Sequence, residues 1–424
     1  MKKQITLAGL WALVFTGIGA MAQNISADRL KKDVSFLASD KLKGRGTSSE
    51  EELMAAKYIS AEFAKLKLSP LGDIGNPANG AHMNERSFLY EFTFKKNTNP
   101  HDTSTVNIPD RKGYDVVAYL DNGAPYTIVI GGHYDHLGLG HDHNSLDANP
   151  DGKIHHGADD NASGTAGVLE LARYFVNNKK TEKYNFLFMC FSGEELGLLG
   201  SKKWCDRPTL PLEKINYMIN MDMIGRLNDS TQKLLVYGVG TSPAWVPLLD
   251  KTNSTFSIKK DSSGIGPSDQ TSFYLKDIPV LHFFTGQHKD YHKPSDVAEK
   301  VNYKGEVKVL EYICQLIAAT DDMPKFAFTK TAAPASNTNS FKVTMGVMPD
   351  YAFEGKGMRI DGVSDNKPAA KAGVKTGDIV IGLGGEKVNN VMDYMKALSN
   401  FKKGDTTTVK VLRDTKELEL QVTF

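Results

Sequence analysis

Cysteine is scarce in this sequence. Its 424 residues contain three cysteines, Cys190, Cys205 and Cys314. An odd number leaves at least one free thiol, which excludes a fold held together by a complete disulfide framework. The three cysteines lack metal-ligand spacing, and Cys190 lies in an apolar run typical of a core strand. A metal site in this chain would therefore be built from histidine and carboxylate side chains.

Excess charge of one sign and long apolar runs are absent too. The formal net charge is +1, which gives no electrostatic case for binding nucleic acid or an anionic membrane. Beyond the N-terminus, no apolar run is long enough to span a bilayer. The N-terminus has a basic Lys2-Lys3 start, an apolar run to Ile18 and the small-residue motif Ala20-Met21-Ala22. This pattern predicts a signal peptide over 1–22 and a bacterial periplasmic or secreted protein with no membrane span after cleavage.

Helix-like and strand-like segments alternate through most of the chain. Two helical stretches within 26–66 come first, and the strand-like runs after them are mostly apolar throughout. Such alternation predicts an α/β fold with a mixed, mostly parallel sheet that helices cover on both faces. The expected strands are 88–94, 114–120, 126–132, 186–191, 215–221, 234–239 and 278–284, and the expected helices are 162–176, 194–204, 243–253, 268–275 and 303–319.

A change in composition divides the chain. Residues 329–340 read TKTAAPASNTNS, a small, polar, proline-containing stretch typical of a linker. We therefore expect a large domain over 23–326, a linker over 327–340 and a small domain over 341–424.

Polar side chains follow the expected strands at one end of the sheet. The turn HHGADDNASGTAG at 155–167 places Asp159 and Asp160 before a helix, where like charges need a neighbouring cation. In open α/β sheets, ligands bind beyond the carboxyl ends of the strands. We therefore predict a metal site where this turn meets the residues that follow the other strands, which are His133, Asp135, Glu194, Glu195, Asp222 and His292.

The charges of this set favour two metal ions. Neutral His133 and His292 with ionised Asp159, Glu195 and Asp222 carry three negative charges, which two divalent cations would more than balance. Paired ions about 3.5–4 Å apart are typical of hydrolytic sites. Histidine and carboxylate ligands without cysteine suit two Zn²⁺, although Co²⁺ or Mn²⁺ could replace them.

Five motifs in this order resemble the M28 zinc aminopeptidase family: HYDH, GADDNASG, SGEELGLLGS, NMDMIG and DYHKPSD. The similarity covers about residues 28–319. It implies a zinc exopeptidase fold in which Asp159 bridges two ions. His133 and Asp222 would hold one ion, and Glu195 and His292 the other. A cis peptide bond after the bridging aspartate is also implied, here between Asp159 and Asp160.

The resemblance implies further roles for three residues. Glu194 matches the general base, Asp135 the carboxylate that orients the first histidine, and Tyr291 a tyrosine that stabilises the oxyanion in some members. The implied activity is removal of N-terminal residues from peptide substrates by a metal-activated water. A carboxypeptidase or a glutaminyl cyclase of the same fold, or a non-catalytic peptide-binding protein, are the alternatives.

Other histidines are expected to have structural roles. His141, His143, His155 and His156 surround the long loop before the turn and are expected on a solvated rim, without a clean ligand spacing. His282 lies in an apolar strand and is expected to be a hydrogen-bonded core histidine.

The C-terminal segment 341–424 resembles a bacterial PDZ domain, most clearly at Ala372-Gly373-Val374 and Gly377-Asp378. The resemblance implies a small α+β domain in which a C-terminal peptide adds a strand beside Met358 and Ile360. A loop with Gly355 and Gly357 would bind the peptide carboxylate, opposite a helix with Val391 and Met395. A domain that packs against the rest of the protein without binding any peptide is the alternative.

Overall fold

The computed structural model describes residues 24–73, 85–94, 110–142, 144–147, 149–331, 343–349, 355–363, 367–389 and 391–424. The expected signal peptide and most of the expected linker lie outside these residues. Among the described residues, no helix has both the length and the apolar character needed to cross a bilayer.

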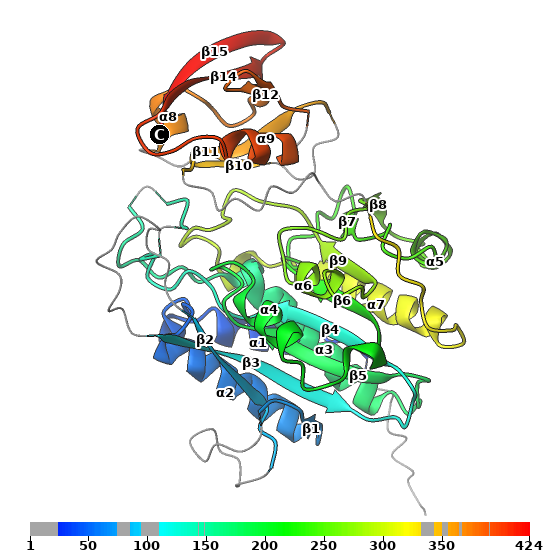
Figure 1. Cartoon of the computed structure of the whole chain (residues 1–424). Helices are drawn as coiled ribbons and strands as arrows, with labels where there is room; N and C mark the ends of the chain where they lie inside the picture. The colour runs from blue at the N-terminus through cyan, green and yellow to red at the C-terminus, as the bar shows by residue number, and fades with distance from the viewer. Residues whose placement is uncertain are drawn as a thin grey trace, which may run out of the picture.

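A nine-stranded mixed sheet forms the centre of the large domain (Figure 1). Its order is β1-β3-β5-β4-β6-β9-β7-β8, and β2 pairs with β3. The central strands β5, β4, β6 and β9 run parallel, whereas β3 and β7 join them antiparallel. The strands are β1 (Ser69–Pro70), β2 (Leu89–Phe94), β3 (Arg111–Leu120), β4 (Thr127–His133), β5 (Asn185–Phe191), β6 (Ile215–Met221), β7 (Lys233–Tyr237), β8 (Ser257–Lys260) and β9 (Val280–Phe284).

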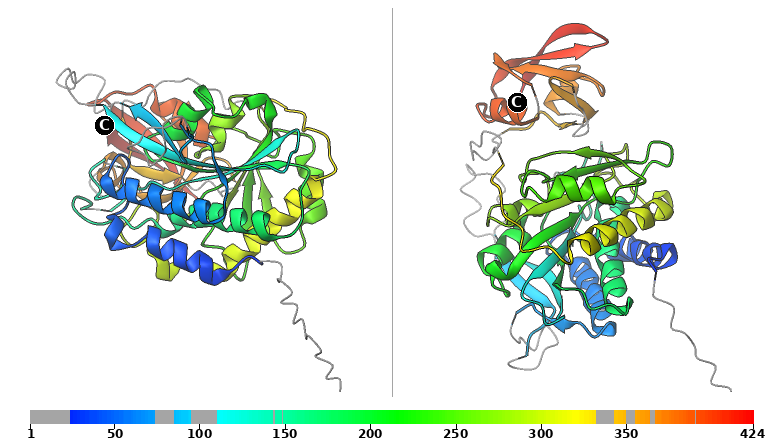
Figure 2. Two further views of the ribbon diagram at one scale, coloured as in Figure 1. Left: turned by 90° about the horizontal axis from the view of Figure 1, so that it is seen from below. Right: turned by 90° about the vertical axis from the view of Figure 1, so that its right-hand side faces the viewer.

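Helices cover both faces of this sheet, as the sequence predicts (Figures 1 and 2). Side chains alternate along each strand, so Ile128 and Ile130 of β4 pack in one core and Val129 packs in the other. The first core takes α1 (Ala27–Leu37), α2 (Glu50–Lys65), α3 (Gly164–Asn177), α5 (Trp245–Thr252) and α7 (Tyr303–Thr320), and the second takes α4 (Leu199–Asp206) and α6 (Gln270–Tyr274). Short helical turns lie at η1 (Asp40–Leu42), η4 (Ala158–Ser163), η5 (Leu212–Lys214) and η6 (Ala298–Lys300).

Two helix starts differ from the prediction. The helix expected from residue 194 begins only at Leu199, because Gly193, Gly197 and Leu198 have positive φ angles that a right-handed helix cannot include. The helix expected from residue 162 begins at Gly164, after the irregular turn η4. Both differences lie beside the candidate site, where irregular backbone orients side chains.

The C-terminal part forms a separate antiparallel sheet in the order β10-β11-β12-β14-β15, with β13 beside β12. Its residues Ile360, Val380, Val409 and Val411 are fully buried in a core of their own. The α+β character predicted for this region is confirmed. The elements are β10 (Val347–Pro349), β11 (Met358–Val363), α8 (Pro368–Lys371), β12 (Ile379–Leu383), β13 (Glu386–Lys387), α9 (Val391–Leu398), β14 (Thr406–Arg413) and β15 (Lys416–Thr423).

Candidate functional site

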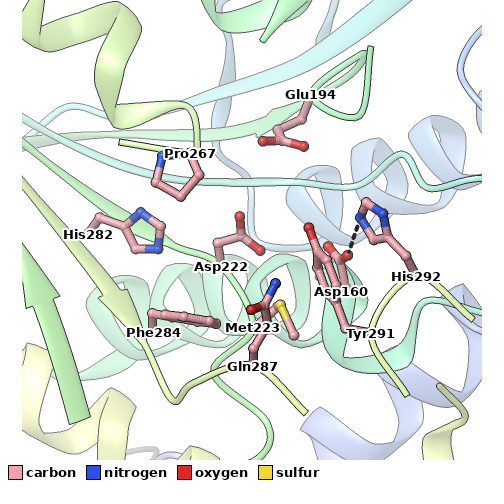
Figure 3. A pocket seen from close by; sticks show the side chains of 10 residues that line it. All are labelled: Asp160, Glu194, Asp222, Met223, Pro267, His282, Phe284, Gln287, Tyr291 and His292. Carbon is pink, nitrogen blue, oxygen red and sulfur yellow. Dashed lines mark ion pairs between the residues drawn. The ribbon is translucent and has the colours of Figure 1, made fainter. Parts of the chain in front are cut away.

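Four strands of the large sheet deliver side chains to one edge. His133 is the last residue of β4, Glu194 and Glu195 lie in the turn after β5, and Asp222 directly follows β6. His292 comes from the loop after β9, where its φ angle is 53°. Figure 3 shows Glu194, Asp222 and His292 around one pocket, as the sequence predicts from the strand ends.

Asp160 lies between the two histidines of this site. Its Oδ2 is 3.2 Å from Nε2 of His292 (Figure 3). Its Oδ1 is 3.4 Å from Nε2 of His133. On one side, Oδ1 of Asp222 is 3.3 Å from Nε2 of His133. On the other, Oε2 of Glu195 is 3.1 Å from Nε2 of His292. One carboxylate thus joins two groups of candidate ligands.

The predicted role of Asp159 as the bridging ligand requires correction. Its carboxylate accepts hydrogen bonds from N of Gly225 at 2.6 Å and from the Ser163 hydroxyl at 3.0 Å, and contacts Nε2 of His288 at 3.1 Å. The non-helical backbone of Asp160 inside η4 turns the two neighbouring carboxylates toward different partners. The cis peptide bond joins Asp160 to Asn161, so the predicted position of that bond, between Asp159 and Asp160, was wrong.

The donor set fits divalent cations. Nε2 of His133, Oδ2 of Asp160 and Oδ1 of Asp222 are buried and have no hydrogen-bond partner among the described residues. Two groups have ligand atoms within 4.8 Å of one another, His133 with Glu194 and Asp222, and His136 with Asp160 and Glu195. Clustered carboxylates with bare imidazole nitrogens are the ligands that zinc binds in open, catalytic sites.

The pKa shifts at the site show that its carboxylates need a neighbouring positive charge. Burial disfavours a charged His133, yet the carboxylates of Asp222 and Glu194 raise its pKa well above the ordinary value. Burial likewise disfavours a charged Asp160, but the close imidazole rings of His133 and His292 hold its pKa well below the ordinary value. Protons on the histidines therefore compensate these carboxylates where no metal is bound.

Neighbouring groups orient both histidines. Nδ1 of His292 donates to the carbonyl of Asn144 at 2.8 Å, which leaves Nε2 facing Asp160. Nδ1 of His133 lies 3.2 Å from the carbonyl of Asp135 and 3.5 Å from its carboxylate. That carboxylate accepts the Thr47 hydroxyl at 2.7 Å and N of Glu194 at 3.1 Å. Asp135 therefore contacts His133 mainly through its backbone, whereas its carboxylate positions the turn of Glu194.

Glu194 has the setting of a group that exchanges protons. It lines the pocket, and its Oε2 lies 3.8 Å from Nε2 of His133. Burial is the main cause that raises the pKa of Glu194 well above its ordinary value, and Asp222 and Glu195 add to it. Tyr291 lines the same pocket, and its ring stacks on that of His292 with centroids 3.9 Å apart.

His136 was missed by the sequence reasoning. Its Nδ1 lies 2.7 Å from Oε1 of Glu195, while the other oxygen of Glu195 faces His292. The rings of His136 and His292 meet edge to face at 5.9 Å. The final histidine of HYDH was the available signal for this contact.

Arg45 is a second residue without a predicted role. It is fully buried and donates to the carbonyls of Tyr134, His156 and Gly157, each at 2.6 Å. It thereby ties the end of β4 to the turn that carries Asp160. The backbone N–H groups of Asp159 and Asp160 both donate to Asp296, which completes the support of this turn.

One of the loop histidines does not lie on the solvated rim that the sequence predicts. His141 and His156 are exposed or partly exposed, and His156 pairs with Asp40 at 2.9 Å. His155 is fully buried, and its Nε2 contacts the Ser145 hydroxyl at 2.6 Å. That hydroxyl also donates to the carbonyl of His292, so the loop supports the site. His143 lies outside the described residues.

The predicted peptide groove of the small domain is only partly described. Met358 and Ile360 are buried in the domain core, Gly355 is exposed and Met395 is half-buried. Gly357 has a φ angle of 105°, and a Cβ there would lie 2.5 Å from the Ile379 side chain. The side chain of Val391 lies outside the described residues. Peptide binding beside β11 stays a prediction.

Two family models match the chain. Residues 115–317 match peptidase family M28, and residues 335–424 match the PDZ domain. Leucine aminopeptidase 2 of Arthroderma otae is 27% identical over 221 residues, which cover 47% of this chain and 43% of that protein. The chain thus spans less than half the length of this curated relative.

Solved structures show the same fold. A leucine aminopeptidase precursor from Bacteroides thetaiotaomicron has a TM-score of 0.54 and 15% identity over 70% of this chain and 98% of that chain. A glutaminyl cyclase from the same organism, bound to N-acetylhistamine, has a TM-score of 0.53 and 15% identity over 70% of this chain and 99% of that chain. By these matches, the chain carries a domain of peptidase family M28 followed by a PDZ domain.

Proposed function

We propose that the chain is an aminopeptidase that uses two divalent metal ions, zinc by preference. The observation that carries this proposal is Asp160 between His133 and His292, with one further carboxylate beside each histidine. His133, Asp160 and Asp222 would hold one ion, and Asp160, Glu195 and His292 the other. Bound there, the ions would activate a water molecule and polarise the scissile carbonyl.

The protein's own groups would handle the protons. Glu194 lies beside the ligand set and would take a proton from the attacking water. Its raised pKa suits the later return of that proton to the leaving amine. Tyr291 would donate a hydrogen bond to the oxygen that gains charge. Glu195 would keep Oε2 for the metal, because His136 binds Oε1.

Hydrolysis of aminoacyl arylamides tests this proposal. The zinc-loaded protein should release arylamine, and a chelator should abolish the release until zinc is restored. N-blocked arylamides serve as the control, because an aminopeptidase requires a free α-amino group. Release from peptides with a free carboxyl end would indicate a carboxypeptidase, and cyclisation of N-terminal glutamine without arylamine release would indicate a glutaminyl cyclase. Zinc binding without any turnover would favour the non-catalytic reading.

Location and recognition are part of the proposal. The N-terminal pattern supports export with cleavage after Ala22. Mass spectrometry of the mature protein from a bacterial host tests this, since a chain that retains residue 1 would contradict it.

The PDZ domain would bind the C-terminus of a partner peptide, which calorimetry with carboxylate-ended and amidated peptides would test.

A further inference from the structure

The pocket at the candidate metal site extends beyond the proposed ligands. Its volume is about 70 Å³, and the proposed ligands Asp160, Asp222 and His292 form its polar side together with Glu194 (Figure 3). Met223 and Phe284 give it apolar walls, and His282 is a polar group in its lining. If the proposed function holds, on which this inference rests, the side chain of the first substrate residue would enter here.

His282 belongs to the wall formed by β9. Residues two apart on a strand share a face, so His282 and Phe284 both line the cavity, as Figure 3 shows. The His282 ring lies 5.4 Å from that of Tyr237 and 6.1 Å from that of Phe284. Only 2% of the residue is exposed. The imidazole is therefore a fixed polar group in an otherwise aromatic wall.

The hydrogen bonds around His282 define its tautomer. Nδ1 lies 3.0 Å from Oε1 of Gln270, and that oxygen also accepts the Asn220 side-chain amide at 3.2 Å. An amide oxygen can only accept a hydrogen bond, so the contact with Oε1 requires Nδ1 to carry the proton. Burial lowers the pKa of His282 to about 4, which keeps the ring neutral. Nε2 consequently presents a lone pair.

This lone pair is unused. Nε2 of His282 is buried and has no hydrogen-bond partner among the residues that the structure describes. A bound apolar side chain would leave this buried acceptor without a hydrogen bond, which is unfavourable. A side chain with an N–H or O–H group would satisfy it. His282 thus discriminates between substrates of the same shape.

Other residues of the cavity further limit which substrate side chain can bind there. Oε1 of Gln287 is also buried without a partner among the described residues. Its carboxamide can act as donor or acceptor, so it accommodates a second polar atom without selecting for one. The small volume and the Phe284 ring favour compact side chains over tyrosine or tryptophan.

We propose that this cavity selects substrates whose first residue has a compact, neutral side chain with a hydrogen-bond donor, namely threonine, serine or asparagine. Nε2 of His282 accepts that hydrogen bond.

Two nearly isosteric substrate pairs test the proposal. The zinc-loaded full-length protein is assayed with threonyl against valyl arylamide and with asparaginyl against leucyl arylamide. We expect kcat/KM to favour the donor-bearing member of each pair by about tenfold, equivalent to about 1.4 kcal/mol. Calorimetry with the free amino acids as competing products should show the same order, and this readout needs no turnover.

His282→Phe removes the acceptor and keeps an aromatic ring, so both ratios should fall to about one or invert. Phe256→Leu, a substitution outside the cavity, is the control that should keep the wild-type ratios. Circular dichroism and zinc content establish that each variant is folded. If His282→Phe does not fold, the wild-type ratios still decide.

If the wild-type protein shows no preference for the donor-bearing member of either pair, in kcat/KM or in binding, the inference is overturned. Arylamide turnover in the same assays would still support the proposed function. Absent turnover with preserved binding preference would overturn the proposed function and support the cavity's selectivity.

Discussion

Oδ2 of Asp160 lies 3.2 Å from Nε2 of His292, whereas the preceding carboxylate of Asp159 is bound by the Gly225 amide. Of these two neighbours, only Asp160 is therefore placed to contact both histidine groups. Asp160→Asn should lose at least one zinc equivalent and reduce kcat/KM on the order of 100-fold or more, since even outer-shell changes cost about 10–100-fold. Metal analysis of purified variants and arylamide kinetics measure both effects.

Asp159→Asn is the matched control. Its amide oxygen can still accept the Gly225 N–H, so zinc content should stay near that of the unmodified chain. The opposite pattern, with zinc lost only from the Asp159 variant, would restore the ligand set predicted from sequence.

Glu194 should be needed for proton transfer and not for holding metal. Glu194→Gln keeps the size of the side chain but removes its basicity, so zinc should remain while kcat falls by about 10²–10⁴-fold. Equal zinc content with full activity would disprove the role of this carboxylate. Single-turnover kinetics would show whether chemistry is the step that slows.

Glu52 should make the stability of the large domain depend on pH. Burial raises the pKa of Glu52 to about 8, and its carboxyl contacts the Ser192 hydroxyl and N of Ser48. The unfolded chain releases this proton near pH 4.5 but the folded protein keeps it, so stability falls as the pH rises from about 4.5 to about 8.

Glu52→Gln removes this titration. Its stability advantage over the unmodified chain should grow by about 2 kcal/mol between pH 6 and pH 8.5. Urea unfolding of the zinc-loaded proteins at both pH values measures the difference. An advantage that stays constant with pH would show that Glu52 is ionised in the folded protein.

Arg45 should stabilise the turn that carries Asp160. Arg45→Met leaves the buried carbonyls of Tyr134, His156 and Gly157 without their donor, and should lower the free energy of unfolding by about 3 kcal/mol. Lys43→Ala in the same loop removes only an exposed ion pair with Glu51 and should change stability by less than about 1 kcal/mol. Thermal unfolding compares the two variants, and similar losses in both would contradict the role of Arg45.

The arrangement of the large sheet could be predicted because its strands are continuously apolar and its helices periodic. The same alternation predicted which residues would lie at the strand ends, and His133, Glu195, Asp222 and His292 do meet. The choice between Asp159 and Asp160 could not be made this way, because it depends on the irregular backbone of η4. The roles of Arg45 and Asn144 depend on contacts with residues more than 80 positions away, which no local pattern encodes.

Metal stoichiometry tests the central claim most directly. The chelated protein is titrated with zinc while bound metal and arylamide hydrolysis are measured on the same samples. Binding should saturate at two zinc ions per chain, with activity restored by the metal, and Asp160→Asn should fail to reach two. Saturation at one ion, or full hydrolysis in the metal-free protein, would contradict a two-metal site joined by Asp160.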